Sequence, residues 1–202
     1  RLLRQEATLT FAICARELGK FDLAETMIRS LLCEPPDPAL VVKSLLAAAL
    51  LSGIVAPALA LTTTATSSIL FMKQEEKVAR DVYQVLSAKW GHVTFANIAR
   101  SEQRHMDAID NLIARYRLTD PTPAESGKFT YPELQALYDE LVALGNKSLD
   151  DALAVGVLIE QADIADLKDA LKITRERPIR NVFTNLLEGS YNHLAAFTSA
   201  LK

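Results

Sequence analysis

The stretch Ser101-Glu102-Gln103-Arg104-His105-Met106 lies inside a segment with strong helical periodicity. Apolar residues recur around it at helical spacing, at Phe95, Ile98, Ile109 and Leu112. Glu102 and His105 fall on the same stripe, and side chains three apart on a helix have Cβ atoms about 5–6 Å apart. Both should therefore face the core, where an ionised carboxylate needs a compensating cation or hydrogen-bond donors. Glu-x-x-His also holds di-iron and di-manganese centres in helix bundles.

Composition indicates an all-α protein with a core of its own. The chain has 202 residues, only 7 glycines and a net charge of −3, and no strand-like alternation is sustained. No basic block is present, which argues against a nucleic-acid partner. Both cysteines, Cys14 and Cys33, lie near the start. The predicted bundle downstream therefore contains neither a disulfide nor a thiolate metal site.

Residues 43–60 have the pattern of a secretory signal peptide. Lys43 is followed by an apolar run of about 12 residues, and Ala58-Leu59-Ala60 ends it with small residues. The run is short for a membrane span, which needs about 20 residues; a buried helix or a single anchor is the alternative. Cleavage would leave an exported protein, periplasmic or extracellular, with no stable membrane anchor. Residues 61–68 would then be a flexible linker.

Cleavage of this signal peptide predicts a mature N-terminus at Leu61. Mass spectrometry of exported protein should find that terminus, because signal peptidases cut after an A-x-A ending. Exported protein that still carries residues 1–60 would contradict the prediction.

Residues 1–42 are interpreted as an upstream extension. Residues 11–32 have the pattern of an amphipathic helical pair that faintly resembles one tetratricopeptide unit, and a lone repeat cannot bury its own apolar face. An over-extended translation start, with the true beginning near Val41 or Val42, is a second interpretation of this segment.

Four long helices are predicted downstream. The first is capped by Ser67 or Ser68 and runs to Trp90; the second begins near Thr94 and ends before Asp120. The third begins at Ser148, and the fourth has Pro178 in its first turn. The 28-residue connection 120–147 contains a short helix that starts with a Thr130–Glu133 capping box and ends near Leu144. Such a connection can cross the bundle, which makes the third helix parallel to the second.

The other three long helices also place a metal-ligand type of residue on an apolar face. Glu76 lies on the stripe of the first helix, although the neighbouring Glu75 is the alternative. Glu160 and Asp163 lie on one side of the third helix, and His193 faces inward on the fourth. With the short turn, Glu76, Glu102 and His105 should lie within about 5–9 Å of one another along the axis.

Two further residues flank these ligand candidates. Tyr83 lies two turns beyond Glu76, on the same side of the first helix. Packing is one role for it and hydrogen bonding at a metal site is another. Gly189 precedes His193 by one turn and should leave room beside that imidazole.

The pooled set contains four carboxylates and two imidazoles: Glu76, Glu102, His105, Glu160, Asp163 and His193. Buried together, the carboxylates would carry a charge of about −4, which is untenable without cations. Two divalent metal ions would neutralise that charge. The competing interpretation is a purely structural network, in which the histidines hydrogen-bond to the acids and Arg80 and Arg104 balance the charge.

From Ile69 to Leu201 the chain resembles the ferritin-like superfamily, and more closely a family of microbial ferritin-like proteins known as a domain of unknown function. The motifs that carry the resemblance lie at residues 75–83, 101–107, 133–138, 159–167 and 192–194. The superfamily pattern has Glu on the first helix, Glu-x-x-His on the second, Glu on the third and Glu-x-x-His on the fourth. Matching residues are Glu76, Glu102, His105, Glu160 and His193.

One position departs from that pattern. Ser190 stands where the Glu of the fourth helix should be, and Asp163, one turn from Glu160, could restore the missing carboxylate. This departure leaves ordinary ferroxidase geometry open and makes a mononuclear or altered site an alternative.

The resemblance implies a ferritin-like four-helix bundle with two divalent metal ions, iron in the first place and manganese as the alternative. It further implies an oxidoreductase that reacts with oxygen or peroxide or oxidises Fe(II), with Tyr83 as a hydrogen-bond donor near the metals. A homo-oligomer is compatible with these features. The alternative is a non-catalytic metal-binding or protein-interaction bundle, because a fold does not establish a reaction.

Overall fold

The computed structural model describes residues 61–202, which form helices and no strand. These residues contain α4 (Thr63–Trp90), α5 (Val93–Tyr116), α6 (Pro132–Gly145), α7 (Leu149–Ile173) and α8 (Arg177–Ala200). The all-α prediction is confirmed for this part of the chain. The predicted helical pair, the signal peptide and both cysteines lie outside the described residues.

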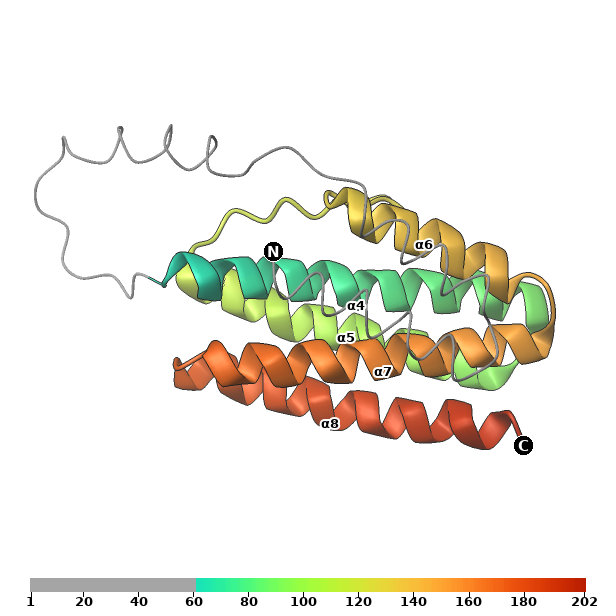
Figure 1. Cartoon of the computed structure of the whole chain (residues 1–202). Helices are drawn as coiled ribbons and strands as arrows, with labels where there is room; N and C mark the ends of the chain where they lie inside the picture. Colours follow the sequence, from blue (N-terminus) through green and yellow to red (C-terminus); the bar gives the residue numbers. More distant parts are fainter. Residues whose placement is uncertain (1–60) are drawn as a thin grey trace, which may run out of the picture.

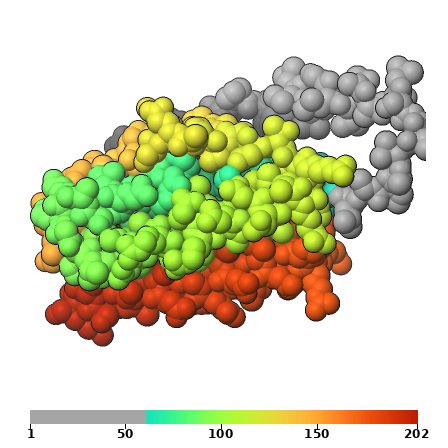
Figure 2. All heavy atoms as spheres, turned by 180° about the vertical axis from the view of Figure 1, so that it is seen from behind, coloured from blue at the N-terminus to red at the C-terminus, as the bar shows by residue number. Residues whose placement is uncertain are grey.

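The four long helices form two antiparallel hairpins packed side by side. The pairs α4–α5 and α7–α8 make the most extensive contacts, and the hairpins meet where α5 packs on α8 and α4 on α7. Helices α5 and α7 run in the same direction, as the long connection predicted (Figure 1). Viewed from behind, α5 and α8 form neighbouring bands of the surface (Figure 2). Helix α6 contacts both α4 and α7 and therefore covers the groove between them.

Local signals set the ends of these helices. Gly91 adopts φ 65° and its N–H donates to the carbonyl of Ser87, which stops α4 and allows the tight turn into α5. Ser148 caps α7 by accepting from the N–H of Asp151. Proline occupies the first turn of α8, where no intrahelical donor is needed.

One predicted helix start and one predicted cap are wrong. Helix α4 begins at Thr63, with the Thr62 side chain accepting from the N–H of Ala65, so most of the predicted linker 61–68 is helical. Helix α6 has no side-chain cap. Instead of completing a capping box, the Thr130 hydroxyl donates to the carbonyl of Pro121. At α4 a different local cap, Thr62, is used, and at α6 the hydroxyl of Thr130 bonds to the preceding loop instead of to the helix.

The core consists of two apolar clusters separated by a polar layer. On α4, Met72 belongs to one cluster and Ala79 to the other; on α5, Ile109 and Ile98 are divided in the same way. Phe183 and Phe197 divide α8 likewise. Each of these helices therefore changes cluster at one level, where its buried polar residues lie. The apolar clusters above and below hold that layer in place and keep water away from it.

A buried cation fastens the long crossover to α4. Lys77 is 1% exposed, and its Nζ lies 2.7 Å from Asp81 Oδ2 and 2.8 Å from the carbonyl oxygen of Glu125. Asp81 in turn accepts from the N–H of Gly127 at 2.8 Å, and Gly127 has φ 72°. The left-handed conformation that glycine tolerates thus brings the loop to the buried carboxylate.

Replacing Lys77 with Met is expected to lower the free energy of unfolding by about 1.5–3 kcal/mol. It removes one of the two cations at the buried Asp81, where Arg80 remains, and leaves the carbonyl of Glu125 without its donor. Chemical denaturation of the metal-free protein measures this loss. Lys172→Met is the matched control, since the Lys172 side chain is 73% exposed and pairs with Asp169 on the surface. That control should change stability by at most about 1 kcal/mol. Equal effects of the two substitutions would contradict the role of Lys77.

Among the described residues, no helix has the length and apolar character required to cross a membrane.

Candidate metal centre

Glu102 lies at the middle of the polar layer. Its Oε2 is 2.8 Å from His105 Nδ1 on the same helix, and its Oε1 is 2.8 Å from His193 Nδ1 on α8. The carboxylate is only 2% exposed. One buried carboxylate therefore stands between two imidazoles that both turn Nδ1 toward it.

A second carboxylate approaches each imidazole from the other hairpin helix. Glu76 Oε2 on α4 lies 3.0 Å from His105 Nδ1, and Glu160 Oε2 on α7 lies 3.5 Å from His193 Nδ1. The result is two triads, Glu76–Glu102–His105 and Glu102–Glu160–His193, each with ligand atoms within 4.8 Å of one another. Glu102 is common to both. The structure thus brings together five predicted ligands, and these triads are groups that could hold a metal ion.

Close helix packing makes room for the imidazoles. The rings of His105 and His193 stack with centroids 5.3 Å apart and planes 25° apart. A Cβ added at Gly189 would lie 2.6 Å from His105 Nε2. The ring of His105 therefore fills the room predicted beside His193, because the glycine lets α8 approach α5 there. Helix rotation, which periodicity sets only coarsely, decides which ring the glycine meets.

Asp163 reaches the polar layer from α7, one turn beyond Glu160. The Ser190 hydroxyl on α8 contacts Asp163 Oδ2 and also lies 3.0 Å from the carbonyl oxygen of Leu186. The other oxygen of Asp163, Oδ1, is buried without a hydrogen-bond partner. Asp163 thus occupies the neighbourhood of Ser190 and keeps one oxygen free to act as a ligand.

Tyr83 lies where the polar layer meets the apolar cluster that contains Phe95 and Phe197. Its hydroxyl donates to Glu160 Oε1 at 2.7 Å, and its ring packs 5.0 Å from Phe197 and 6.2 Å from Phe95. Tyr83 is completely buried. It can therefore hold a proton against Glu160 while the surrounding aromatic rings exclude water.

Electrostatic coupling shifts the pKa of each of these groups. Burial would raise the pKa of Glu102, but the adjacent imidazoles lower it to about 2. Burial would lower the pKa of both histidines, yet the facing carboxylates raise it to about 11 for His105 and about 9 for His193. Burial and the charge of Glu102 raise the pKa of Glu160 to about 8. The layer therefore favours positive charge between its carboxylates.

Even with both imidazoles protonated, some buried ligand atoms of this layer have no hydrogen-bond partner. Glu76 Oε1, Glu102 Oε1 and His193 Nδ1 are buried without a hydrogen-bond partner. His193 Nδ1 and Glu102 Oε1 lie 2.8 Å apart, but not in hydrogen-bonding geometry. Buried polar atoms are rarely left unpaired. Carboxylate oxygens and imidazole nitrogens that converge in this way fit a metal ion, which accepts electron pairs from both.

Glu75 does not join either triad. Burial raises its pKa well above the usual value, and Asp166 and Asp163 raise it further. Glu75 lies with Asp163 in a small cavity of about 30 Å³, under α6. Of the two alternatives on α4, Glu76 is the one that contacts the imidazole layer. Asp166 is not among the predicted ligands, although its spacing of three residues from Asp163 places both on one side of α7.

The arginines of the structural-network interpretation lie elsewhere. Arg80 bonds to Asp81 and to the side-chain oxygen of Gln103, and Arg104 is exposed. The positive partners shown within the layer are instead its two histidines, His105 and His193.

Metal-free protein should lose stability as the pH rises from 6.5 to about 11. The folded pKa values of His105 and His193 lie above the ordinary value of 6.5, so their contribution is complete below pH 6.5. It is lost as the pH passes about 9 and then about 11. Ionisation of Glu160 acts in the same direction near pH 8.

Thermal unfolding with a chelator present measures this effect as a fall in Tm. Glu102→Gln should flatten the slope, because it removes the charge that faces both imidazoles. Asp107→Asn, on the exposed face of α5, should leave the slope unchanged. A wild-type Tm that is constant or rises over this range would contradict the assignment of charges.

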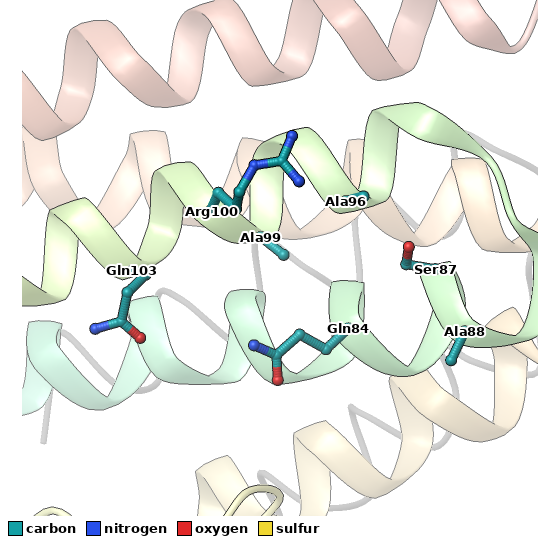
Figure 3. A pocket seen from close by; sticks show the side chains of 7 residues that line it. All are labelled: Gln84, Ser87, Ala88, Ala96, Ala99, Arg100 and Gln103. Carbon is teal, nitrogen blue, oxygen red and sulfur yellow. The ribbon is translucent and has the colours of Figure 1, made fainter.

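A groove on the outer face of α4 and α5 is separate from this layer (Figure 3). It is lined by Gln84, Ser87, Ala88, Ala96, Ala99, Arg100 and Gln103. None of the six predicted ligands lines it. This groove is therefore not part of the candidate metal centre.

The fold and the polar layer together define a helical bundle with a buried carboxylate–histidine cluster that could bind metal. The family model described as an uncharacterized protein domain, DUF2202, matches residues 65–202, and the chain belongs to this family. The uncharacterized protein MJ0754 of Methanocaldococcus jannaschii is 46% identical over 134 residues, which cover 66% of this chain and 72% of that protein.

The fold has a counterpart in a solved structure. The crystal structure of hypothetical protein MJ0754 from Methanococcus jannaschii matches with a TM-score of 0.69 and 41% identity. The match covers 74% of this chain and 85% of that chain.

Proposed function

We propose that this protein holds a dinuclear metal centre and is an oxidoreductase of the ferritin-like type. The observation that carries the proposal is the double triad that shares Glu102, with buried and unpaired ligand atoms in both halves. Two divalent ions would balance the charge of its three carboxylates and the neighbouring Asp163, which burial otherwise opposes.

The two ions divide the ligands between the hairpins. Glu76 and His105 would hold one ion, Glu160 and His193 the other, and Glu102 would serve both. Asp163 would supply the carboxylate that Ser190 cannot. This assignment supports the ferritin-like pattern of one carboxylate or one Glu-x-x-His per helix, with the fourth helix altered.

The mixture of ligand types supports iron, with manganese as the alternative. Imidazole suits iron, and carboxylate suits manganese and other hard ions, while the layer has no thiolate. Bound iron or manganese would pass electrons to oxygen or peroxide. In an Fe(II) oxidation, Fe(II) would be the electron donor. The protein's own residues would contribute the ligand field, the proton of Tyr83 at Glu160 and a dry aromatic wall.

We propose that the protein acts outside the cytoplasm. The support is the Lys43–Ala60 pattern, which lies outside the described residues.

Elemental analysis of the purified domain, followed by an assay of oxygen and peroxide consumption with Fe(II), tests the proposal. The expected result is about two iron or manganese ions per chain and turnover that depends on them. Glu102→Gln is the matched variant, since it keeps the shape of the side chain and removes its charge. A domain that binds metal without turnover would refute the oxidoreductase, and one that binds no metal would refute the centre itself.

A further inference from the structure

A small polar cavity lies beside the candidate metal centre, in the groove between α4 and α7 that α6 covers. Its volume is about 30 Å³. Helix α6 supplies an apolar wall, formed by Leu134, Leu137 and Leu141. Two carboxylates, Glu75 from α4 and Asp163 from α7, also line the cavity. The cavity is therefore an acidic pocket in an otherwise apolar lining.

Both carboxylates in the cavity have an oxygen without a partner. Glu75 Oε2 and Asp163 Oδ1 are closed off from solvent and accept no hydrogen bond. A space of about 30 Å³ accommodates one small occupant, since a single water molecule needs at least about 10–15 Å³. A carboxylate oxygen without a partner can accept a hydrogen bond or bind a cation, so these two oxygens favour a donor or a cation between them.

Asp163 connects this cavity to the metal centre. One of its oxygens is held by Ser190 within the polar layer, and the other is the free oxygen named above. Its negative charge also acts on Glu76. A cation held at Asp163 would therefore lie next to the polar layer that contains the first triad.

The interface between α5 and α8 presents a different chemistry. There His105 turns its Nε2 against the backbone at Gly189, and the ligating Nδ1 atoms of both histidines point inward. A cation arriving on that side meets imidazole edges, whereas on the α6 side it meets carboxylate oxygens.

We propose that Glu75 and Asp163 form an entry site, through which divalent cations pass from beneath α6 into the dinuclear centre. The inference rests on the proposed metal centre but assigns a separate role to Glu75. Buried negative charge concentrates cations locally and so accelerates their association. Glu75 should accordingly govern the rate of metal loading and contribute little to the final number of bound ions.

Stopped-flow loading of the metal-free protein with Co²⁺, followed by its absorption bands, tests this role. Glu75→Gln should slow loading by about tenfold or more, with the wild-type stoichiometry and final spectrum retained. Glu75→Asp keeps the charge and should load faster than Glu75→Gln. Asp107→Asn removes an equal charge from the exposed face of α5 and should load at the wild-type rate. Circular dichroism verifies that each variant is folded.

The outcomes separate this inference from the proposed function. A folded Glu75→Gln variant that loads at the wild-type rate would overturn the entry site and leave the dinuclear centre intact. A lower final stoichiometry in that variant would also overturn it, because Glu75 would then be a permanent ligand. If the wild type binds no Co²⁺, the dinuclear centre itself is refuted, and the entry site with it.

Discussion

Replacing Glu102 with alanine is expected to remove both metal ions from the protein. Glu102 is the residue common to the two triads, and its two oxygens each lie 2.8 Å from a different imidazole. Loss of a supporting residue outside the ligand set already lowers metal affinity about 10–100-fold, so loss of a shared ligand should exceed 100-fold or so. By contrast, His105→Ala removes a ligand from one triad only and should affect one ion more than the other.

Metal titration with elemental analysis distinguishes these results. The wild type, Glu102→Ala and His105→Ala are compared, with Asp107→Asn as the control on the outer face of the same helix. Helix content should be unchanged, because apolar clusters flank the layer on both sides. Full stoichiometry in Glu102→Ala would show that the double triad is not the metal site.

Substituting Asp163 is expected to produce the second large effect. Asp163→Asn keeps the shape of the side chain and its contact with Ser190, but removes one negative charge from the layer. We expect metal affinity to fall about 10–100-fold, because the layer then has three carboxylates for two divalent ions. Unchanged affinity would show that Asp163 is not a ligand.

A double substitution tests whether Asp163 replaces the carboxylate missing from α8. Ser190 is completely buried and contacts Asp163, so a glutamate at position 190 needs the space that Asp163 occupies. Asp163→Ala provides that space. Asp163→Ala combined with Ser190→Glu should recover part of the affinity lost in Asp163→Ala alone. No recovery in a folded double variant would reject the exchange, even if Asp163 proves to be a ligand.

Much of the fold was predictable because its signals are local. The tight turn at Gly91, the cap at Ser148 and the proline at position 178 act within a few residues of themselves. Heptad-like apolar stripes then fix the buried face of each helix. The start of α4 and the cap of α6 differ from the prediction. Several hydroxyls compete to cap α4, and the Thr130 hydroxyl before α6 bonds to the loop at Pro121.

The candidate site was partly predictable for the same reason. Glu102, His105, Glu160 and His193 interrupt apolar stripes, and a charged residue on such a stripe is visible without a structure. Their common depth follows from counting residues back to short turns, since each adds about 1.5 Å.

The sequence by itself determined the helices, their order and the ligand types that each helix turns inward, because these depend on periodicity along one chain segment. Tertiary structure alone decided that Glu76 rather than Glu75 contacts His105, and that Glu102 is shared. It also decided that Gly189 lies against His105. These features depend on the rotation of each helix about its axis. Successive residues on a helix are about 100° apart, so apolar periodicity does not resolve a rotation of a few tens of degrees. Packing of side chains from all four long helices fixes that rotation.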